Sequence, residues 1–435
     1  MPDGVDAAMD QLQVLALESS GNRSPPHAKP EQLPSSDHAV LPLGQLGDGP
    51  VRASGAHSPP KRTFDIHVML NIRFGGHRPI VAAPVLPVGA RALRCCDMIG
   101  ALVALGLLWG QPGAAAERVE FTVAASGDLL VHEPVAAQAL ANGHGRRYDF
   151  RPMFRSIRSR IEGADLALCH METPLVPGPV RGYPSFRTPP GLARSVKAVG
   201  WDVCSTASNH SLDAGQFGID TTLNALDRAK LRHAGTARSA KEATKSTILE
   251  AKGVKVAFLS FTAVSNGQSV PHAWSFNWAD AARIEADARR ARKRGAQAVI
   301  VTLHWGTEYS HAVSPAQAAL ARRLTRSPAI TAIVGQHVHV VQPIRRVNGK
   351  PVVFGEGNLI SNQTSACCPA ESQDGLIALI DFVATGERVR AARVRYVPTW
   401  VRHPDYRVLP AKRGSESWRR TVSVAGRRPG IRPVR

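Results

Sequence analysis

The chain has 435 residues, 43% of them hydrophobic, which is enough apolar material for one large folded domain or two ordinary ones and excludes a chain that is disordered throughout. Its formal net charge of +20 at pH 7 indicates contact with an anionic partner, such as a phosphate-rich envelope or an acidic polymer. Basic residues are not interleaved with stacking aromatic residues, as they are in proteins that bind single-stranded nucleic acid, so we expect no nucleic acid among the partners.

The N-terminal segment is predicted to lie outside the folded domain. Residues 1–90 are rich in Pro, Gly, Ser and His without a sustained helical or strand period, which predicts a disordered extension or a start codon assigned too far upstream. Residues 91–116 have the pattern of a secretory signal peptide: Arg91 and Arg94, an apolar run of about a dozen residues after Met98, and small residues ending at Ala116. A bilayer span needs about 20 apolar residues. We therefore expect export to the periplasm or the extracellular face of the cell envelope, with a membrane anchor as the open alternative.

Strand-like and helical patterns alternate from residue 118 onward. The predicted strands are short apolar runs, and the predicted helices carry apolar residues at helical spacing, as Phe217, Leu223 and Leu226 do. The strands are expected at 119–128, 164–176, 201–210, 254–262, 296–306 and 329–340, and the helices at 150–163, 191–200, 217–231, 280–296 and 314–326.

The C-terminal part of this alternation predicts the fold class. A hairpin is expected at 345–358, where Asn348 and Gly349 form a turn signal. Strands separated by helices favour parallel pairing with helices on both faces of the sheet, and the hairpin adds antiparallel strands at its edge. The prediction is an α/β domain of about residues 118–400. Residues 401–435, with ten Arg or Lys against two acidic residues, are predicted to be a basic, solvated tail.

Four cysteines follow the predicted signal peptide, and an exported compartment permits disulfides. Cys169 and Cys204 each lie near the end of an apolar run, so they could lie on neighbouring strands. Cys367 and Cys368 are adjacent in the chain, which makes a mutual bond strained. The chain has no C-x-x-C spacing, so neither a zinc ribbon nor a thioredoxin-type redox site is expected.

Polar residues recur where the predicted strands end. Ligands of open α/β sheets bind beyond the carboxyl ends of the strands, because loops converge there. Taken alone, each of these residues is more often part of a turn or a structural histidine. Their recurrence at the same place favours one shared site. The groups are Gly127-Asp128, His170-Met171-Glu172, Asn209-His210, His304-Trp305-Gly306 with Glu308, Gln336-His337-Val338-His339 and Gly357-Asn358.

The residue types in these groups indicate a metal centre. Carboxylates, imidazoles and an Asn carbonyl, without thiolates, suit zinc, manganese or iron better than calcium. His337 and His339 could point the same way from an extended chain and bind one ion. Two ions held together polarise a phosphoryl oxygen and lower the pKa of a bridging water, and a nearby His can protonate the leaving oxygen.

The ordered series of motifs resembles the CapA-type proteins of bacterial poly-γ-glutamate capsule synthesis, which are relatives of the calcineurin-like metallophosphatases. The resemblance runs along nearly all of residues 120–363. Its motifs are SGDLLVH, ADLALCHMETPLV, FRTPPGLARSVKAVGWDV, STASNHSLDAGQFGIDTTLNAL, VKVAFLSFTAVSNG, VTLHWGTEYS, QAALARRL, IVGQHVHVVQPI and FGEGNLISNQ.

The resemblance implies a layered αββα metallophosphatase fold with mixed sheets and one or two divalent ions of Mn, Zn or Fe. His210 then falls at the position that faces the leaving group, and Asp213 either orients His210 or caps the helix that begins near Gly215. These two residues are the candidate catalytic residues. The implied metal ligands are Asp128, Glu172, Asn209, His304, His337 and His339.

Four positions depart from the family pattern without removing an implied ligand. The family's Asp-x-His motif is absent, and His132 is the imidazole nearest to Asp128. His170 stands in place of a usual Asn, either as an added ligand or as a neutral substitution. Ser208 replaces an Asn, and Val338 replaces a Pro between the paired histidines.

Two functions remain open at this point. One is an exported metal-dependent hydrolase that acts on a phosphoester-type bond during synthesis or export of an anionic capsule polymer. The other is a non-catalytic accessory protein that binds the polymer through its positive charge. In both, the expected partners are the anionic polymer or a phosphoester substrate and capsule synthase components in the membrane.

Overall fold

The computed structural model describes residues 117–434. The predicted N-terminal extension, 1–90, and the predicted signal peptide, 91–116, lie outside the described residues. Among the helices of residues 117–434, none combines the length and the apolar character needed to cross a membrane.

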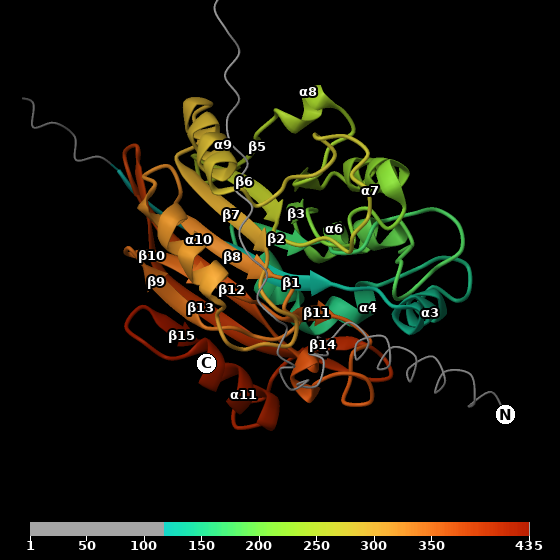
Figure 1. The fold of residues 1–435 in the computed structure, drawn as a ribbon. Coiled ribbons are helices and arrows are strands. Elements are labelled where there is room, and N and C mark those ends of the chain that lie inside the picture. The colour runs from blue at the N-terminus through green and yellow to red at the C-terminus, as the bar shows by residue number, and fades with distance from the viewer. Residues whose placement is uncertain (1–116, 435) are drawn as a thin grey trace, which may run out of the picture. The chain divides into compact units, whose positions relative to one another are not determined.

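A nine-stranded mixed sheet forms the first half of the fold (Figure 1). Its order is β14-β13-β12-β1-β2-β3-β4, with β11 paired to β1 and β15 paired to β13. The strands β1 to β4 are parallel, and the long hairpin of β12 and β13 continues the sheet in antiparallel fashion. Its strands are β1 (Arg118–Leu129), β2 (Leu166–His170), β3 (Val203–Ser205), β4 (Arg232–Ala234), β11 (Asn358–Ile360), β12 (Asp374–Thr385), β13 (Arg388–Arg402), β14 (Arg407–Pro410) and β15 (Ile431–Pro433).

A six-stranded sheet in the order β5-β6-β7-β8-β10-β9 forms the second half. Its centre is parallel, and both edges are antiparallel. The predicted hairpin is confirmed at the β9 edge. The strands are β5 (Thr247–Ala251), β6 (Val254–Thr262), β7 (Ala298–His304), β8 (Ala332–Gln336), β9 (Ile344–Val347) and β10 (Lys350–Val353).

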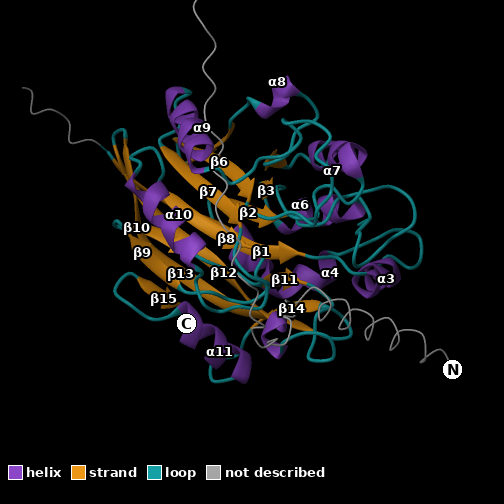
Figure 2. Cartoon of the chain, viewed as in Figure 1, coloured by secondary structure: helices purple, strands orange, loops and turns teal. Residues whose placement is uncertain are grey.

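Alternating side chains of each strand enter different cores. On β6, Val256 and Phe258 enter the core between the two sheets, whereas Ala257 and Leu259 enter the core beneath the helices that cover the second sheet. This arrangement gives four layers, helices on sheet on sheet on helices, as Figure 2 shows. The predicted αββα layering is confirmed.

The helices lie on the outer faces of the two sheets. Those against the first sheet are α3 (Glu133–Asn142), α4 (Arg151–Phe154), α5 (Arg158–Glu162), α6 (Gly191–Val199) and α7 (Gly215–Arg228), and those against the second are α9 (Ala281–Lys293) and α10 (Pro315–Arg326). The expectation from the alternation alone, helices on both faces of a sheet, was wrong. The inner face of each sheet packs against the other sheet, and a strand buried on both faces has the same apolar pattern in either case.

The C-terminal residues are folded, so the prediction of a solvated tail was also wrong. After β14, helix α11 (Glu416–Ala425) runs into β15, which pairs with β13. Ala425 and Ile431 are buried in the core between the sheets. Apolar side chains spaced among the arginines anchor this segment. The prediction of a solvated tail rested on net charge and did not take these side chains into account.

A disulfide joins Cys169 on β2 to Cys204 on β3. The two residues are direct partners in the parallel register of these strands, with their Cα atoms 4.5 Å apart. The expectation that they lie on neighbouring strands is confirmed.

Candidate metal centre

The carboxyl ends of four parallel strands meet at one place. In the first sheet, Asp128 on β1 lies beside His170 on β2. In the second sheet, His304 at the end of β7 lies beside Gln336 at the end of β8. The inner faces of the two sheets are packed together, so these ends bring polar side chains from both sheets into one buried cluster.

Two groups of ligand atoms share Asp128. The first consists of Asp128, His170 and His304, and the second of Asp128, Glu172 and His339. Within each group the ligand atoms all lie within 4.8 Å of one another, and every residue is buried. A carboxylate common to two three-residue groups can bridge two cations.

Buried polar atoms in this cluster lack partners among the described residues. Both carboxylate oxygens of Glu172 and Nδ1 of His337 make no hydrogen bond there. The nearest cationic atom to Glu172 is Nε2 of His339 at 3.7 Å. Because an unsatisfied buried carboxylate is costly, the two oxygens of Glu172 fit a bound divalent cation.

Burial sets the charges of the cluster. Burial lowers the pKa of His170 to about 4 and that of His337 to about 3, and it lowers the pKa of His304 well below its ordinary value. Neutral imidazoles keep a lone pair available for a metal ion. Burial raises the pKa of Glu172 well above its ordinary range.

His339 behaves differently from the other histidines. Burial alone would lower its pKa, but the carboxylates of Glu172 and Asp128 outweigh this effect and raise it to about 10. Its Nδ1 lies 3.3 Å from Oδ2 of Asp128 and 3.0 Å from Oδ1 of Asn358. The imidazolium thus supplies positive charge where a metal ion would otherwise do so.

The two histidines of the H-x-H motif are not on an extended chain, so the reason given above for pairing them was wrong. The strand β8 ends at Gln336, and His337 and His339 have φ values of 91° and 56°. Their ring centroids are 6.1 Å apart. His339 belongs to one ligand group, whereas His337 belongs to neither; its backbone N–H donates to Asp128, and its ring lies 4.7 Å from that of His304.

Asn209 and His170 complete the inner part of the site. The carbonyl Oδ1 of Asn209 lies 2.8 Å from Nε2 of His304, and its amide donates to Asn266. The sequence allows two roles for His170, an added metal ligand or a neutral substitution. The structure places its Nε2 2.9 Å from Nδ1 of His304, and Oγ of Ser205 lies 2.8 Å from its Nδ1. The signal in the sequence was its position at the strand end, two residues before Glu172.

His210 and Asp213 form a pair beside this cluster. Nδ1 of His210 lies 2.8 Å from Oδ2 of Asp213, and the carboxylate also accepts hydrogen bonds from the backbone N–H of Phe186 and from Nε2 of Gln268. The described residues supply no side-chain cap to the first turn of α7. Of the two roles considered for Asp213, the geometry therefore supports the orientation of His210.

A cavity of about 420 Å³ opens in front of the pair and the cluster. Asn209, His210 and His339 line it, together with aromatic and amide side chains that the sequence analysis did not identify: Tyr183, Phe186, Asn266, Gln268, Tyr309 and Gln363. Most of these residues lie on loops far apart in the chain, so no local pattern marks them. His132 also lines the cavity, but it accepts a hydrogen bond from the backbone N–H of Asn362 and belongs to neither ligand group.

A family model described as bacterial capsule synthesis protein PGA_cap matches residues 122–363. The capsule biosynthesis protein CapA of Bacillus anthracis is 25% identical over 342 residues, which cover 74% of this chain and 80% of that protein. The PGA biosynthesis protein CapA of Bacillus subtilis is 30% identical over 175 residues, 39% of this chain and 44% of that protein.

Among solved structures, the calcineurin-like phosphoesterase YfkN of Bacillus subtilis has a TM-score of 0.40 and 14% identity, covering 65% of this chain and 91% of that chain. The family model spans more than half of the 435 residues. The chain therefore belongs to the bacterial capsule synthesis protein family PGA_cap.

Proposed function

We propose that this capsule synthesis protein is a metal-dependent hydrolase of a phosphoester-type bond, acting in the synthesis or export of an anionic capsule polymer such as poly-γ-glutamate. The observation that carries the proposal is the buried pair of ligand groups sharing Asp128, with the His210–Asp213 pair beside it and a cavity in front. A protein that only binds a polymer has no need for unsatisfied carboxylate oxygens in its interior.

The proposed roles follow from position. Asp128, Glu172, His170, His304 and His339 would hold the metal, with Asn209 supplying an amide oxygen. When bound, divalent ions of this kind polarise a phosphoryl oxygen and supply hydroxide at neutral pH.

His210 would act on the substrate directly, and its neighbours hold it in place. His210 lines the cavity and is held through Nδ1 by Asp213, which leaves Nε2 to give a proton to the leaving oxygen. Phe186 packs edge-on against the His210 ring, with centroids 4.7 Å apart, and restricts its rotation. The buried position of the cluster keeps bulk water away from the reacting groups.

The metal content of the purified full chain tests this proposal. We expect about one or two Mn, Zn or Fe ions per chain and metal-dependent hydrolysis of a p-nitrophenyl phosphoester. Asp128→Asn should lose both metal and turnover, because it removes the carboxylate shared by the two groups. Glu387→Gln, an exposed acidic residue in the turn between β12 and β13, is the matched control and should retain both. A folded chain that binds no added Mn or Zn would overturn the proposal.

The proposed site of action is the exported side of the membrane, in contact with membrane components of the capsule synthase. The support is the signal-peptide pattern of residues 91–116. Mass spectrometry of the mature N-terminus tests it. A start near Glu117 would support cleavage and export, whereas a chain that retains the run after Met98 would support an anchor.

A further inference from the structure

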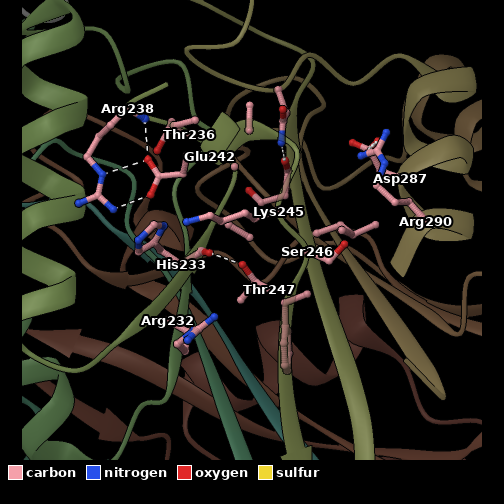
Figure 3. Close-up of a pocket in the computed structure, with 18 of the residues that line it drawn as sticks. Arg232, His233, Thr236, Arg238, Glu242, Lys245, Ser246, Thr247, Asp287 and Arg290 are labelled. Carbon is pink, nitrogen blue, oxygen red and sulfur yellow. Dashed lines mark hydrogen bonds and ion pairs between the residues drawn. The ribbon is translucent and has the colours of Figure 1, made fainter. Parts of the chain in front are cut away.

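Two cavities outside the metal centre differ in their charge. The cavity in Figure 3, about 420 Å³ in volume, is lined by both cationic and acidic side chains. Its acidic residues are paired with arginines: Arg238 binds Asp227 and Glu242, and Arg290 binds Asp287. Much of the charge there is balanced within the protein.

The second cavity, about 910 Å³, lies among β13, α11 and β15 at the C-terminal end of the chain (Figure 1). Five arginines line it, with no acidic residue among the lining residues, and Trp418 forms part of its wall. We call it the arginine cavity. Its arginines are Arg395, Arg413, Arg427, Arg428 and Arg432.

Most of these arginines have no acidic partner. Only Arg395 forms an ion pair, with Asp381 at 2.6 Å. The other four are exposed and make no ion pair with any residue between 117 and 434. On the adjacent helix, the acidic side chain of Glu416 is bound to Arg420, which also binds Asp374. Four like charges around one hollow repel one another, and an anionic ligand would relieve this repulsion.

The chemistry of the lining indicates which anion fits. Guanidinium groups bind carboxylates through two parallel hydrogen bonds, and several of them in one hollow suit a chain of repeated carboxylates. Nucleic acid would need open aromatic faces for its bases. Trp418, the aromatic residue of this wall, has the Arg427 guanidinium 5.2 Å from its ring centroid, so one of its two faces is already covered.

We propose that the arginine cavity binds a segment of a polycarboxylate chain. The preference for a carboxylate polymer of the capsule rests on the proposed function, whereas the anionic character of the ligand rests on the cavity alone. The cavity would thus act as a second contact for the polymer, separate from the metal centre, and four of its five arginines lie in the basic C-terminal segment 401–435.

The test measures binding of fluorescently labelled poly-glutamate to the full chain at low and at physiological salt. The site variant replaces Arg413, Arg427, Arg428 and Arg432 by Gln. The control variant replaces by Gln four exposed arginines that make no ion pair within residues 117–434: Arg146, Arg160, Arg289 and Arg326. Both variants lose the same charge. We expect the site variant to bind about tenfold more weakly or worse, the control variant to lose less than about threefold, and wild-type binding to weaken as salt is added.

A third variant has Lys in place of Arg at the same four positions, which keeps the positive charge and removes the planar guanidinium groups. It should recover only part of the binding that the Gln variant loses, because Lys cannot form the paired hydrogen bonds of a guanidinium group; a Lys variant that binds as tightly as wild type would count against the proposal. Equal losses in the site and control variants would show attraction by net charge alone and overturn it. Tighter binding of an oligo(dT) strand of equal charge, lost in the site variant, would identify a nucleic-acid site instead.

These outcomes are distinguishable from a failure of the proposed function. Metal content and phosphoester turnover are measured on the same site variant and should be unchanged, because none of its four residues lies in the metal centre. If the chain hydrolyses no phosphoester yet loses poly-glutamate binding in the site variant, the cavity proposal stands without the hydrolase. If turnover is present but the cavity binds no poly-glutamate, only the cavity proposal fails.

Discussion

The pairing of His210 with Asp213 determines how the proposed proton donor is held. Three groups converge on the carboxylate of Asp213: the His210 imidazole, the backbone N–H of Phe186 and the side-chain amide of Gln268. Such a carboxylate is fixed in place, and it fixes the tautomer and orientation of the imidazole in turn. Asp213 does not line the cavity, so it is a positioning residue, and His210 is the residue that faces the substrate.

We predict that His210→Ala lowers kcat for a phosphoester by about 10²-fold to 10⁴-fold, the range of general acid catalysis, without changing the metal content. Asp213→Asn should lower kcat less, by about tenfold to 10²-fold, and leave KM nearly unchanged, because it disturbs the donor and not substrate binding. Steady-state kinetics and metal analysis of both variants measure this. Unchanged kcat in His210→Ala would show that another group protonates the leaving oxygen.

Glu356 is a buried acid outside the two ligand groups. Burial raises its pKa to about 8. Among residues 117–434, Oε2 alone of its two oxygens has a hydrogen-bond partner, Nε2 of Gln336 at 3.0 Å. The folded state therefore holds this proton to higher pH than the unfolded state, in which the pKa is near its ordinary value of 4.5. Stability is lost as the pH rises from about 4.5, and the loss is complete above about 8.

Glu356→Gln removes this titration and keeps the shape of the side chain. We predict that wild type loses a few kcal/mol of unfolding free energy between pH 5 and pH 9, at about 1.4 kcal/mol per unit of difference between the folded and unfolded pKa of Glu356. The variant lacks this loss, so its stability relative to wild type rises by the same amount. Urea unfolding of both proteins in the presence of a chelator, at several pH values, measures the difference. A difference that stays constant with pH would mean that Glu356 titrates normally in the folded protein.

At the scale of elements, the disulfide stabilises the junction between β2 and β3, the two strands that end beside the metal centre. It joins two residues that are 35 positions apart in the chain, and it lies in the core under the helices of the first sheet. Replacing both Cys169 and Cys204 by Ala should cost about 2–4 kcal/mol of unfolding free energy. Denaturant unfolding measures it, with reductant as the control: dithiothreitol should destabilise wild type and have little effect on the double variant.

The elements differ in how far the sequence predicts them. The strands β1 to β3 and β6 to β8 follow from apolar runs, and their ends place Asp128, Glu172, Asn209 and His304 near one another. The arrangement of two sheets follows from the family resemblance and not from the pattern, because a strand covered by a helix and one covered by a sheet are equally apolar. Within the described residues, β4, β5, β12 and β13 were not predicted. β13 alternates arginines with apolar residues and so resembles a solvated segment.

At the scale of the whole molecule, the candidate site depends on contacts between distant parts of the chain. The sequence identifies polar residues at strand ends, but not that Asp128 belongs to two ligand groups or that His337 belongs to neither. Nor does it place Asn266 and Phe186, which come from long loops, against the cavity. These facts follow from the packing of one sheet on the other, which fixes the distances between groups that lie up to two hundred residues apart.

This packing also means that the metal centre opposes stability when no metal is bound. Asp128 and Glu172 are buried together, and a cation that binds the folded state alone stabilises it by mass action. We predict that Mn or Zn at about 100 times its dissociation constant raises the unfolding free energy of wild type by about 2.7 kcal/mol.

Asp128→Asn should gain nothing from the metal, because it removes the carboxylate that both ligand groups share. Thermal unfolding of both proteins, with and without metal, measures this, and Glu387→Gln should behave as wild type does. Equal stabilisation of wild type and Asp128→Asn by the metal would place the ion elsewhere in the protein. A large loss of stability of Asp128→Asn in chelator would show that Asp128 serves the fold as well as the site.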